Sequence, residues 1–413
     1  MSVVDRTKLP VPGPALAFAF PHIAHRRLPN GLQIRAVAHR AVPVAAMVLL
    51  VPGGSSADAA SQTGLSSMTA DLLDEGSRGQ SALDIADRLA RIGGDFDIDV
   101  TSDATVLSLA TLDRFFDTGL DLLYDMVVHP NLHEADFDRV RQLRLERLRQ
   151  LRNLPGAIGD RAFAQVLYQS HPYAQPGFGT VAALGGLTVD DVRRFHGVMF
   201  QPAGTTLVVV GDRDVEALLD LGTRAFGGWD AGTAPAASLR DRGRAPTPPV
   251  PSARLSVVAR PGAAQSELRI GRVAAPRDTP DYHKLVLLNA VLGGQFVSRL
   301  NMNLREQKGY TYGVRTGFDL RRGPGPFVVQ TSVGTDVTAP ALTEALRELG
   351  DIRDSRPVTS EEMELARSSV ALGYPRGFGG AAGGARGVAA RPATCPTATS
   401  RTSSRGCGCP RST

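Results

Sequence analysis

The stretch SRLNMNLREQKGYTY, residues 298–312, is the most distinctive part of the sequence. It follows Leu292-Gly293-Gly294 and contains an arginine and a tyrosine seven residues apart, Arg305 and Tyr312. Apolar residues recur with helical spacing around it, at 285–292, 340–349 and 360–372, and form a strand-like run at 327–333. This mixture of helix and strand patterns predicts an α+β fold.

A similar order of elements precedes this region. The apolar pattern predicts strands at 32–38, 44–51, 96–100, 106–110 and 205–210, with helices at 65–73, 82–92, 115–127 and 134–152. Two further strands are predicted at 255–259 and 267–273. The recurrence indicates two similar α+β halves that arose by internal duplication, of which the second is shorter and apparently truncated.

Changes in composition divide the chain into five parts. Prolines crowd among Gly, Ala and Arg at 231–252 without a periodic apolar pattern, which is typical of a linker. We therefore expect an N-terminal leader at 1–24, a first half at 25–230, this Pro-rich linker, a second half at 253–374 and a tail at 375–413. The tail is rich in Gly, Ala, Arg, Ser, Thr and Pro and is predicted to be disordered. Because the composition changes so abruptly after Tyr374, a shifted reading frame is a further hypothesis for the tail.

Charge and cysteine content exclude several classes of protein. The net charge of +5 comes from the tail, because residues 375–413 hold six arginines and no acid, and the remaining 40 basic residues face 41 acidic ones. A nucleic-acid-binding function is therefore not expected. All three cysteines, Cys395, Cys407 and Cys409, lie in the tail, so the body has no disulfide framework. No apolar run is long enough to span a membrane, and no signal segment is present, which favours the cytoplasm.

Several short motifs occur in a fixed order along both halves. They include Leu28-Pro29-Asn30-Gly31-Leu32, Gly64-Leu65 at the start of a predicted helix, Gly93-Gly94 and His171-Pro172-Tyr173. With the block at 298–312, the sequence resembles the pitrilysin/insulinase family of zinc metallopeptidases from about residue 25 to 374. The resemblance implies two halves that face each other like a clam shell, with the metal in the first half and substrate contacts in the second.

The zinc motif of this family is absent from the sequence. The family's His-x-x-Glu-His places two imidazoles on one face of a helix, where they bind one zinc ion beside a glutamate that polarises water. Counted from Gly64-Leu65, its three positions fall on Ser67, Ala70 and Asp71, and the third ligand falls at about Arg147, beside Glu146. These residues cannot replace the ligands, so the sequence predicts no metal and no cofactor in this chain.

Arg305 and Tyr312 match the pair with which the family holds the carbonyl side of the bond that is cleaved. Peptide hydrolysis develops negative charge on the carbonyl oxygen, and a phenol beside a guanidinium stabilises that charge. The alternative is that Arg305 forms a structural salt bridge with Glu306 and that Tyr312 is a core aromatic. The resemblance favours substrate binding by both residues.

These observations predict the function of the chain. Some family members are heterodimers in which one subunit carries zinc and the other carries the Arg/Tyr pair. We expect a zinc-free partner subunit, inactive alone, that presents Arg305 and Tyr312 to a peptide bound with a zinc-bearing homologous subunit. Two alternatives stay open: a structural or assembly subunit, like the respiratory-complex core proteins that resemble this family, and a gene product inactivated by truncation.

Other candidate residues have weaker support. Ser66 and Ser67 lack a nearby histidine and a strand–turn–helix elbow, as a serine nucleophile requires. His171 and His196 are isolated in sequence, which is more typical of structural histidines than of metal ligands. The predicted strand at 96–100 corresponds to the edge strand with which the family pairs substrate backbone, but Asp97-Ile98 replaces the usual Asn-Ala.

Overall fold

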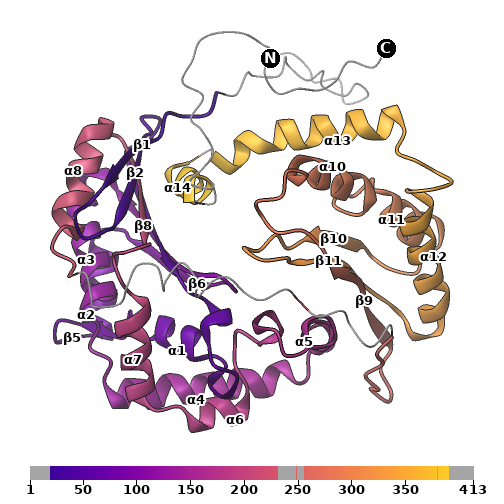
Figure 1. Ribbon diagram of the computed structural model, residues 1–413, viewed down its shortest axis with the longest axis horizontal. Helices are drawn as coiled ribbons and strands as arrows, with labels where there is room; N and C mark the ends of the chain where they lie inside the picture. The colour runs from indigo at the N-terminus through magenta and orange to yellow at the C-terminus, as the bar shows by residue number, and fades with distance from the viewer. Residues whose placement is uncertain (1–18, 231–247, 249–254, 379, 390–413) are drawn as a thin grey trace, which may run out of the picture.

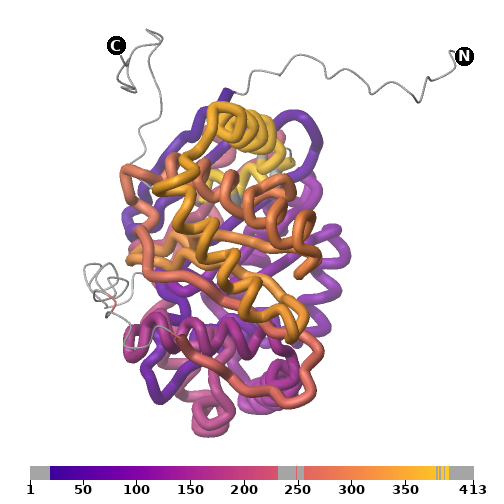
Figure 2. The backbone as a smooth tube through the Cα atoms, turned by 90° about the vertical axis from the view of Figure 1, so that its right-hand side faces the viewer, coloured from indigo at the N-terminus to yellow at the C-terminus, as the bar shows by residue number. Residues whose placement is uncertain are grey.

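The computed structural model describes residues 19–230, 248, 255–378 and 380–389, which form two α+β halves that face each other (Figure 1). Residues 1–18, most of the predicted linker and residues 390–413 lie outside the described residues. The view turned by 90° shows the second half in front of the first (Figure 2). Among the described residues, no helix is both long and apolar enough to cross a membrane.

The first half is built on a six-stranded mixed sheet with the order β1-β2-β8-β3-β7-β6. Its central strand β8 lies parallel to β2 and antiparallel to β3, and all its residues are buried, as its apolar sequence TLVVVG predicts. The strands are β1 (Ala24–Arg27), β2 (Gln33–Ala38), β3 (Val44–Pro52), β6 (Asp95–Val100), β7 (Ala104–Leu112) and β8 (Thr206–Gly211), with a separate hairpin of β4 (Gly76–Ser77) and β5 (Gln80–Ser81).

Helices cover one face of this sheet and form the main core with it. On the left in Figure 1, α2, α3 and α8 pack against the face that carries Ile34, Met47 and Leu109. A second apolar cluster joins α1, α4, α6 and α7 below the sheet. The helices of this half are α1 (Leu65–Asp71), α2 (Ala82–Arg91), α3 (Phe116–Val128), α4 (Glu134–Leu151), α5 (Pro155–Tyr168), α6 (Val181–Gly186), α7 (Val189–Met199) and α8 (Val215–Phe226).

The second half repeats part of this topology. Its sheet has the order β10-β11-β9 with antiparallel pairing throughout, which matches β6-β7-β3 of the first half. The repeated order supports the predicted duplication. The elements of this half are β9 (Gln265–Val273), α10 (Tyr282–Leu292), α11 (Arg299–Asn301), a π-helix η5 (Met302–Gln307), β10 (Val314–Phe318), β11 (Pro326–Gly334), α12 (Thr338–Asp351) and α13 (Ser360–Gly373).

The prediction of a strand at 255–259 is wrong. This segment has no secondary structure, and Leu255, Val257 and Val258 are 72%, 80% and 57% exposed. In the first half, β2 is held in the sheet by β8, which comes from the end of that half. The described part of the second half contains no counterpart of β8, so the apolar segment at 255–259 has no strand to pair with.

The prediction that the tail is disordered from residue 375 is also wrong for its first part. After η7 (Tyr374–Phe378), helix α14 (Ala381–Ala389) packs on the second face of the first-half sheet, between the two halves (Figure 1). Ala385 and Val388 are fully buried there, and Arg35 donates a hydrogen bond from Nη1 to the Val388 carbonyl oxygen at 3.1 Å. The three cysteines lie outside the described residues, and so does the rest of the tail.

Direct contacts join the two halves. The Tyr173 hydroxyl, from η4 (Pro172–Ala174), donates to Asp103 Oδ1 at 2.7 Å and accepts from the Gly323 N–H at 2.9 Å. Arg269 on β9 donates from Nε to Asp160 Oδ1 of α5 at 2.6 Å. The turn between β10 and β11 and the strand β9 are therefore both attached to the first half.

Burial of Val388 predicts that α14 stabilises the first half. Val388→Asp would place an unpaired carboxylate against β3 and β8, and we expect it to lower the free energy of unfolding by about 3 kcal/mol in urea titrations. Val257→Asp is the control, because Val257 is 80% exposed, and its effect should stay below about 0.5 kcal/mol. Equal unfolding midpoints for the two variants would contradict the packing of α14.

Candidate functional site

Helix α1 carries the three positions at which a zinc motif is expected. It begins after Gly64, whose φ of 93° favours glycine, and the buried Asp58 carboxylate accepts hydrogen bonds from the N–H groups of Gly64 at 2.8 Å and Ser66 at 2.9 Å. Burial raises the pKa of Asp58 to about 6, although these hydrogen bonds oppose the shift. The Asp58 carboxylate therefore caps the backbone N–H groups at the start of α1 and fixes where the helix begins.

The residues on α1 make protein contacts in place of metal contacts. The Ser67 hydroxyl donates to the Gly177 carbonyl oxygen at 2.8 Å, and Ala70 is buried. Asp71 Oδ2 accepts from Arg144 Nε of α4 at 2.6 Å. The side chain of Arg144 is 6% exposed, and its guanidinium lies over the Phe178 ring at 4.6 Å. A buried cation thus occupies the side of Asp71 that faces α4.

These residues do not fit a zinc ion. The only anionic group at the three positions is Asp71, which is already paired with a guanidinium. In the part of the chain that the structure describes, no three His, Cys, Asp or Glu side chains are grouped closely enough to hold a metal.

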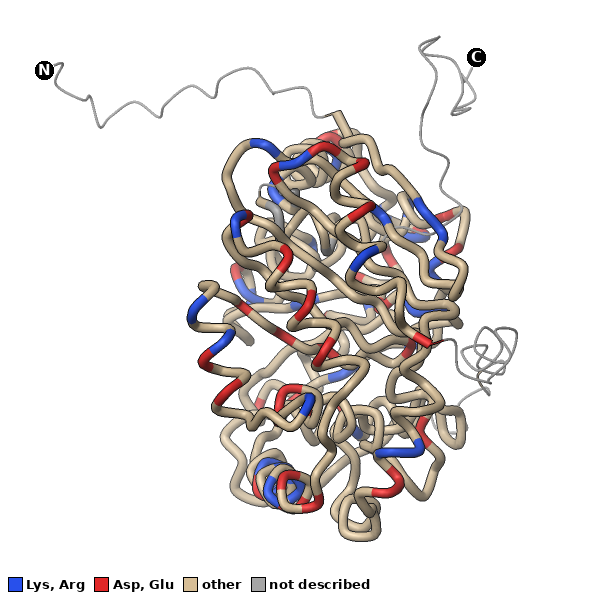
Figure 3. The backbone as a smooth tube through the Cα atoms, turned by 90° about the vertical axis from the view of Figure 1, so that its left-hand side faces the viewer, with Lys and Arg blue, Asp and Glu red and all other residues tan. Residues whose placement is uncertain are grey.

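Arg147, at which the count along the chain places the third ligand position, does not contact Asp71 of α1 in the structure. Arg147 is exposed and donates to Gln150 at 3.0 Å, while the exposed Glu146 pairs with Arg149. Arg144 is the residue of α4 that meets Asp71, because it shares the buried helix face with Val140 and Leu148. The i, i+4 spacing of these three residues is the sequence signal that could have identified it. Figure 3 shows basic and acidic residues interspersed over the side of the molecule that lies on the left in Figure 1.

Tyr312 lies on the surface of the second half. It belongs to the segment between η5 and β10, and its side chain is 94% exposed. The alternative that Tyr312 is a core aromatic is therefore wrong. The phenol of Tyr312 is therefore accessible from solvent.

Arg305 is part of the π-helix η5 and is about one-third exposed. Its Nε lies 3.5 Å from Glu306 Oε1, and its guanidinium lies over the Phe296 ring at 4.1 Å. The salt bridge considered as an alternative is thus present, but the Glu306 side chain is 43% exposed, and such pairs hold a side chain weakly. The Arg305 guanidinium keeps donors for a further acceptor.

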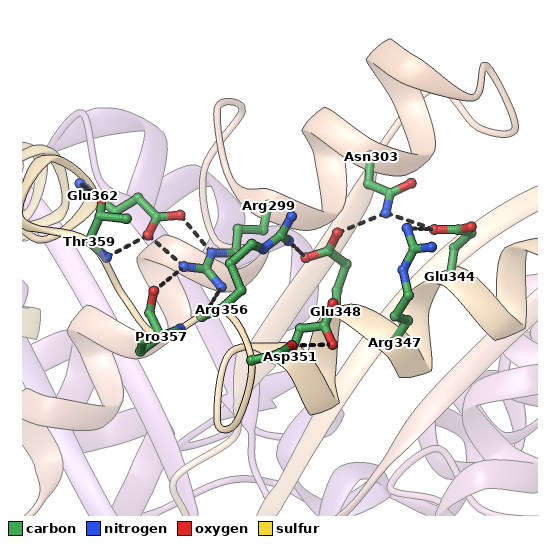
Figure 4. Close-up of polar contacts among 11 residues, drawn as sticks. Arg299, Asn303, Glu344, Arg347, Glu348, Asp351, Arg356, Pro357, Thr359 and Glu362 are labelled. Atoms are coloured by element: carbon green, nitrogen blue, oxygen red, sulfur yellow. Dashed lines mark hydrogen bonds and ion pairs between the residues drawn. The ribbon is translucent and has the colours of Figure 1, made fainter.

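A polar network fixes the helix that leads to Arg305 (Figure 4). Arg299 donates from Nε and Nη2 to the two carboxylate oxygens of Glu362 on α13, both at 2.6 Å, and to the Pro357 carbonyl oxygen at 2.9 Å. This pairing lowers the pKa of the Glu362 carboxyl group. Asn303 donates to Glu348 on α12 at 2.8 Å. The arginine of the Ser298-Arg299-Leu300 motif is therefore a structural anchor, which the sequence alone did not indicate.

The remaining candidates have structural roles. His171 is 3% exposed, and its Nδ1 accepts from the Tyr173 N–H at 3.0 Å. His196 Nε2 lies 2.8 Å from the Val127 carbonyl oxygen, and burial lowers its pKa. The Ser66 hydroxyl donates to Asp58 at 3.2 Å. Strand β6 pairs with β7 alone among the described strands and is therefore an edge strand of the sheet, and its residue Asp97 is exposed.

Comparisons with known proteins agree with this architecture. Residues 36–180 match the family "Insulinase (Peptidase family M16)", and residues 186–370 match "Peptidase M16 inactive domain". A protein of Mycobacterium leprae named as an uncharacterized zinc protease is 24% identical over 86% of this chain and 79% of its own length. A "Non-peptidase homolog" of Helicobacter pylori is 22% identical over 74% of this chain and 69% of its own length.

Solved structures show the same fold. A peptidase M16 inactive domain from Pseudomonas fluorescens superposes with a TM-score of 0.80 at 24% identity and covers 88% of each chain. A protease from Helicobacter pylori also reaches a TM-score of 0.80, at 20% identity, over 88% of this chain and 87% of its own.

The buried position of Arg144 predicts a large effect of its removal. Arg144→Ala leaves Asp71 without its partner and empties the space over Phe178, and we expect a loss of about 2 kcal/mol in the free energy of unfolding. Arg147→Ala on the same helix should change it by less than about 0.5 kcal/mol. Urea titrations of the two variants measure the difference, and a larger effect at Arg147 would contradict the assignment.

The contact between Asp71 and Arg144 also predicts where a metal site could be rebuilt. Ser67→His and Asp71→His place two imidazoles four residues apart, and Arg144→Glu adds a carboxylate opposite them. Equilibrium dialysis with zinc, followed by elemental analysis, should give about one zinc per triple-variant chain. The matched control carries Arg147→Glu in place of Arg144→Glu and should bind zinc more weakly. Equal binding by the two would show that position 144 is not the one facing α1.

Proposed function

Because this chain belongs to the M16 family of peptidases, the insulinase/pitrilysin family, we propose that it is the zinc-free partner subunit of a heterodimeric metallopeptidase. In this proposal a homologous subunit carries zinc, and this chain supplies Arg305 and Tyr312 to the peptide substrate. The observation that carries the proposal is a contrast between the two halves. In the first half the buried Arg144 pairs with Asp71, one of the three positions at which the zinc motif is expected, whereas in the second half the Tyr312 side chain is 94% exposed.

The chemistry of the two side chains supports this role. The exposed phenol of Tyr312 can donate a hydrogen bond to a carbonyl oxygen that gains negative charge during hydrolysis. The guanidinium of Arg305 can donate hydrogen bonds to the same oxygen or to a neighbouring carbonyl oxygen. Neither group is consumed by doing so. Arg299 and Asn303 fix the helix from which Arg305 projects, which reduces the conformational cost of binding.

A structural or assembly role is the second candidate. It is favoured by the relative in Helicobacter pylori, whose name describes it as a non-peptidase homologue. It is also favoured by the residues at the expected zinc positions of the first half, which do not form a set of metal ligands among the described residues. In that role Arg305 and Tyr312 would be dispensable for any activity of the assembly.

Hydrolysis of an internally quenched peptide tests the proposal. This chain alone should not cleave the peptide, whereas a mixture with a zinc-bearing homologue from the same genome should cleave it, and a chelator should abolish the cleavage. Arg305→Ala and Tyr312→Phe should each lower kcat/KM of the mixture by about 10²-fold, because each removes a donor to the developing charge.

The control for this experiment is Arg367→Ala, which removes an exposed arginine of α13 and should leave turnover unchanged. Size-exclusion chromatography shows whether each variant still assembles with the homologue. Full turnover of assembled Arg305→Ala and Tyr312→Phe variants would favour the structural role, and cleavage by this chain alone would contradict the zinc-free assignment.

A further inference from the structure

The sheet of the second half has an open edge at β9. In the first half, the nine-residue β3 has a neighbouring strand on each side, β7 and β8, and six of its residues are buried. Its counterpart β9 also has nine residues, but it pairs with β11 alone among the described strands, and none of its nine residues is buried. The side of β9 that corresponds to the β8 side of β3 therefore has no strand in the part of the chain that the structure describes.

The backbone groups along this edge belong to alternate residues of β9. At the two ends of the ladder, the Ala274 N–H donates to the Gly325 carbonyl oxygen at 2.7 Å, and the Ala264 carbonyl oxygen accepts from the Thr335 N–H at 3.2 Å. Residues of an antiparallel strand alternate between bonding to the partner strand and pointing away from it. The even-numbered residues of β9 therefore bond to β11, and the odd-numbered residues direct their N–H and C=O groups to the open edge. At the centre of the strand these are Glu267, Arg269 and Gly271.

Both faces of β9 are covered, so only the edge is open. Leu268 and Ile270 pack into the apolar cluster that α10 and α12 form with the sheet. On the opposite face, Val273 packs against the cluster that contains Leu167 and Tyr168 of α5. Because side chains of a strand alternate between the two faces, a strand added at this edge would extend both apolar layers.

An exposed apolar segment precedes β9 in the chain. Residues 39–43 join β2 to β3, and residues 260–264 join residues 255–259 to β9, so both connections have five residues. Residues 255–259 therefore correspond in chain order to β2, which β8 separates from β3 in the first-half sheet. Val257 of this segment is 80% exposed. The described second half thus has counterparts of both neighbours of β8 but none of β8 itself.

The first half shows what kind of strand fits between such neighbours. All six residues of β8 are uncharged and buried, and the strand lies antiparallel to β3 and parallel to β2. The segments that flank the second half do not offer such a strand. Residues 231–254 contain five prolines, and residues 390–413 contain no Val, Leu, Ile, Met or aromatic residue. The fitting strand therefore belongs to another polypeptide.

We propose that the open edge of β9 and residues 255–259 form a docking site for a strand of another polypeptide. The strand is an uncharged apolar segment of about six residues, like β8, and lies antiparallel to β9. Hydrogen bonds to the odd-numbered residues of β9 provide affinity, and apolar contacts with residues 255–259 select uncharged strands. The site does not depend on the proposed function, because Tyr312 precedes β10 at the other edge of this sheet.

The test uses a fluorescently labelled peptide of residues 204–212, GTTLVVVGD, which contains the β8 sequence and carries two added lysines for solubility. Fluorescence anisotropy should show saturable binding of this peptide to the full chain. The same peptide with Val208→Pro should bind about tenfold more weakly or worse, because proline lacks an N–H group and does not fit inside a sheet. Equal affinities of the two peptides overturn the inference.

Substitution of Val257 tests the second wall of the docking site. Val257→Asp should weaken binding of the β8 peptide about tenfold or more, because it places an unpaired carboxylate beside the added strand. The matched control is Leu365→Asp, at an apolar residue of α13 that is 50% exposed, and it should leave the affinity unchanged. Circular dichroism verifies that both variants are folded. An unchanged affinity in folded Val257→Asp overturns the inference.

Hydrogen exchange with residue-level mass spectrometry locates the bound peptide. The peptide should slow exchange of the N–H groups of Glu267, Arg269 and Gly271, whereas the even-numbered residues between them, which bond to β11, should change little. Protection of the edge strand β6 in place of β9 would contradict the docking site. Slow exchange of the same three N–H groups without peptide, increasing with chain concentration, would show that a second copy of the chain occupies the edge and would also overturn the inference.

Discussion

The position of strand β8 is the constraint on which the architecture depends. The strand comes from the end of the first half, at Thr206–Gly211, yet it lies in the centre of the sheet between β2 and β3. The sheet of the first half therefore cannot close until its last strand is in place. The described second half has only the β10-β11-β9 part of this pattern, and it is attached to the first half by packing against α5 and by the contacts of its β10–β11 turn with η4.

Much of the fold could be predicted from the sequence because most elements depend on local periodicity. Strand β3 and helix α4 each carry an apolar pattern that their burial reproduces. The wrong predictions concern segments whose secondary structure depends on contacts with residues that are distant in sequence. Residues 255–259 are apolar enough for a strand but lack a partner, and the glycine- and alanine-rich α14 has a weak apolar pattern and is helical against β3 and β8.

The candidate site was predictable to a similar extent. Ordered motifs singled out Arg305 and Tyr312, and the structure leaves both side chains accessible on the second half. Counting residues put the third ligand position at the exposed Arg147, three positions away from Arg144, which pairs with Asp71. A count along the chain does not say which face of a helix is buried. The anchoring roles of Arg299 and Asn303 depend on acceptors that are distant in sequence, such as Glu362, and no short motif encodes such contacts.

Two arginines, one in each half, differ in how firmly the protein itself holds them. The Arg144 side chain is 6% exposed, and its Nε lies 2.6 Å from Asp71 Oδ2. Any ligand of either side chain would have to compete with this ion pair. Arg305 is 33% exposed and has a longer contact of 3.5 Å with an exposed carboxylate. Desolvating Arg305 requires little rearrangement, since the Phe296 ring already excludes water from one face. Under the proposed function, the partner subunit would carry the metal in its first half, and this chain would add the accessible Arg305 of its second half.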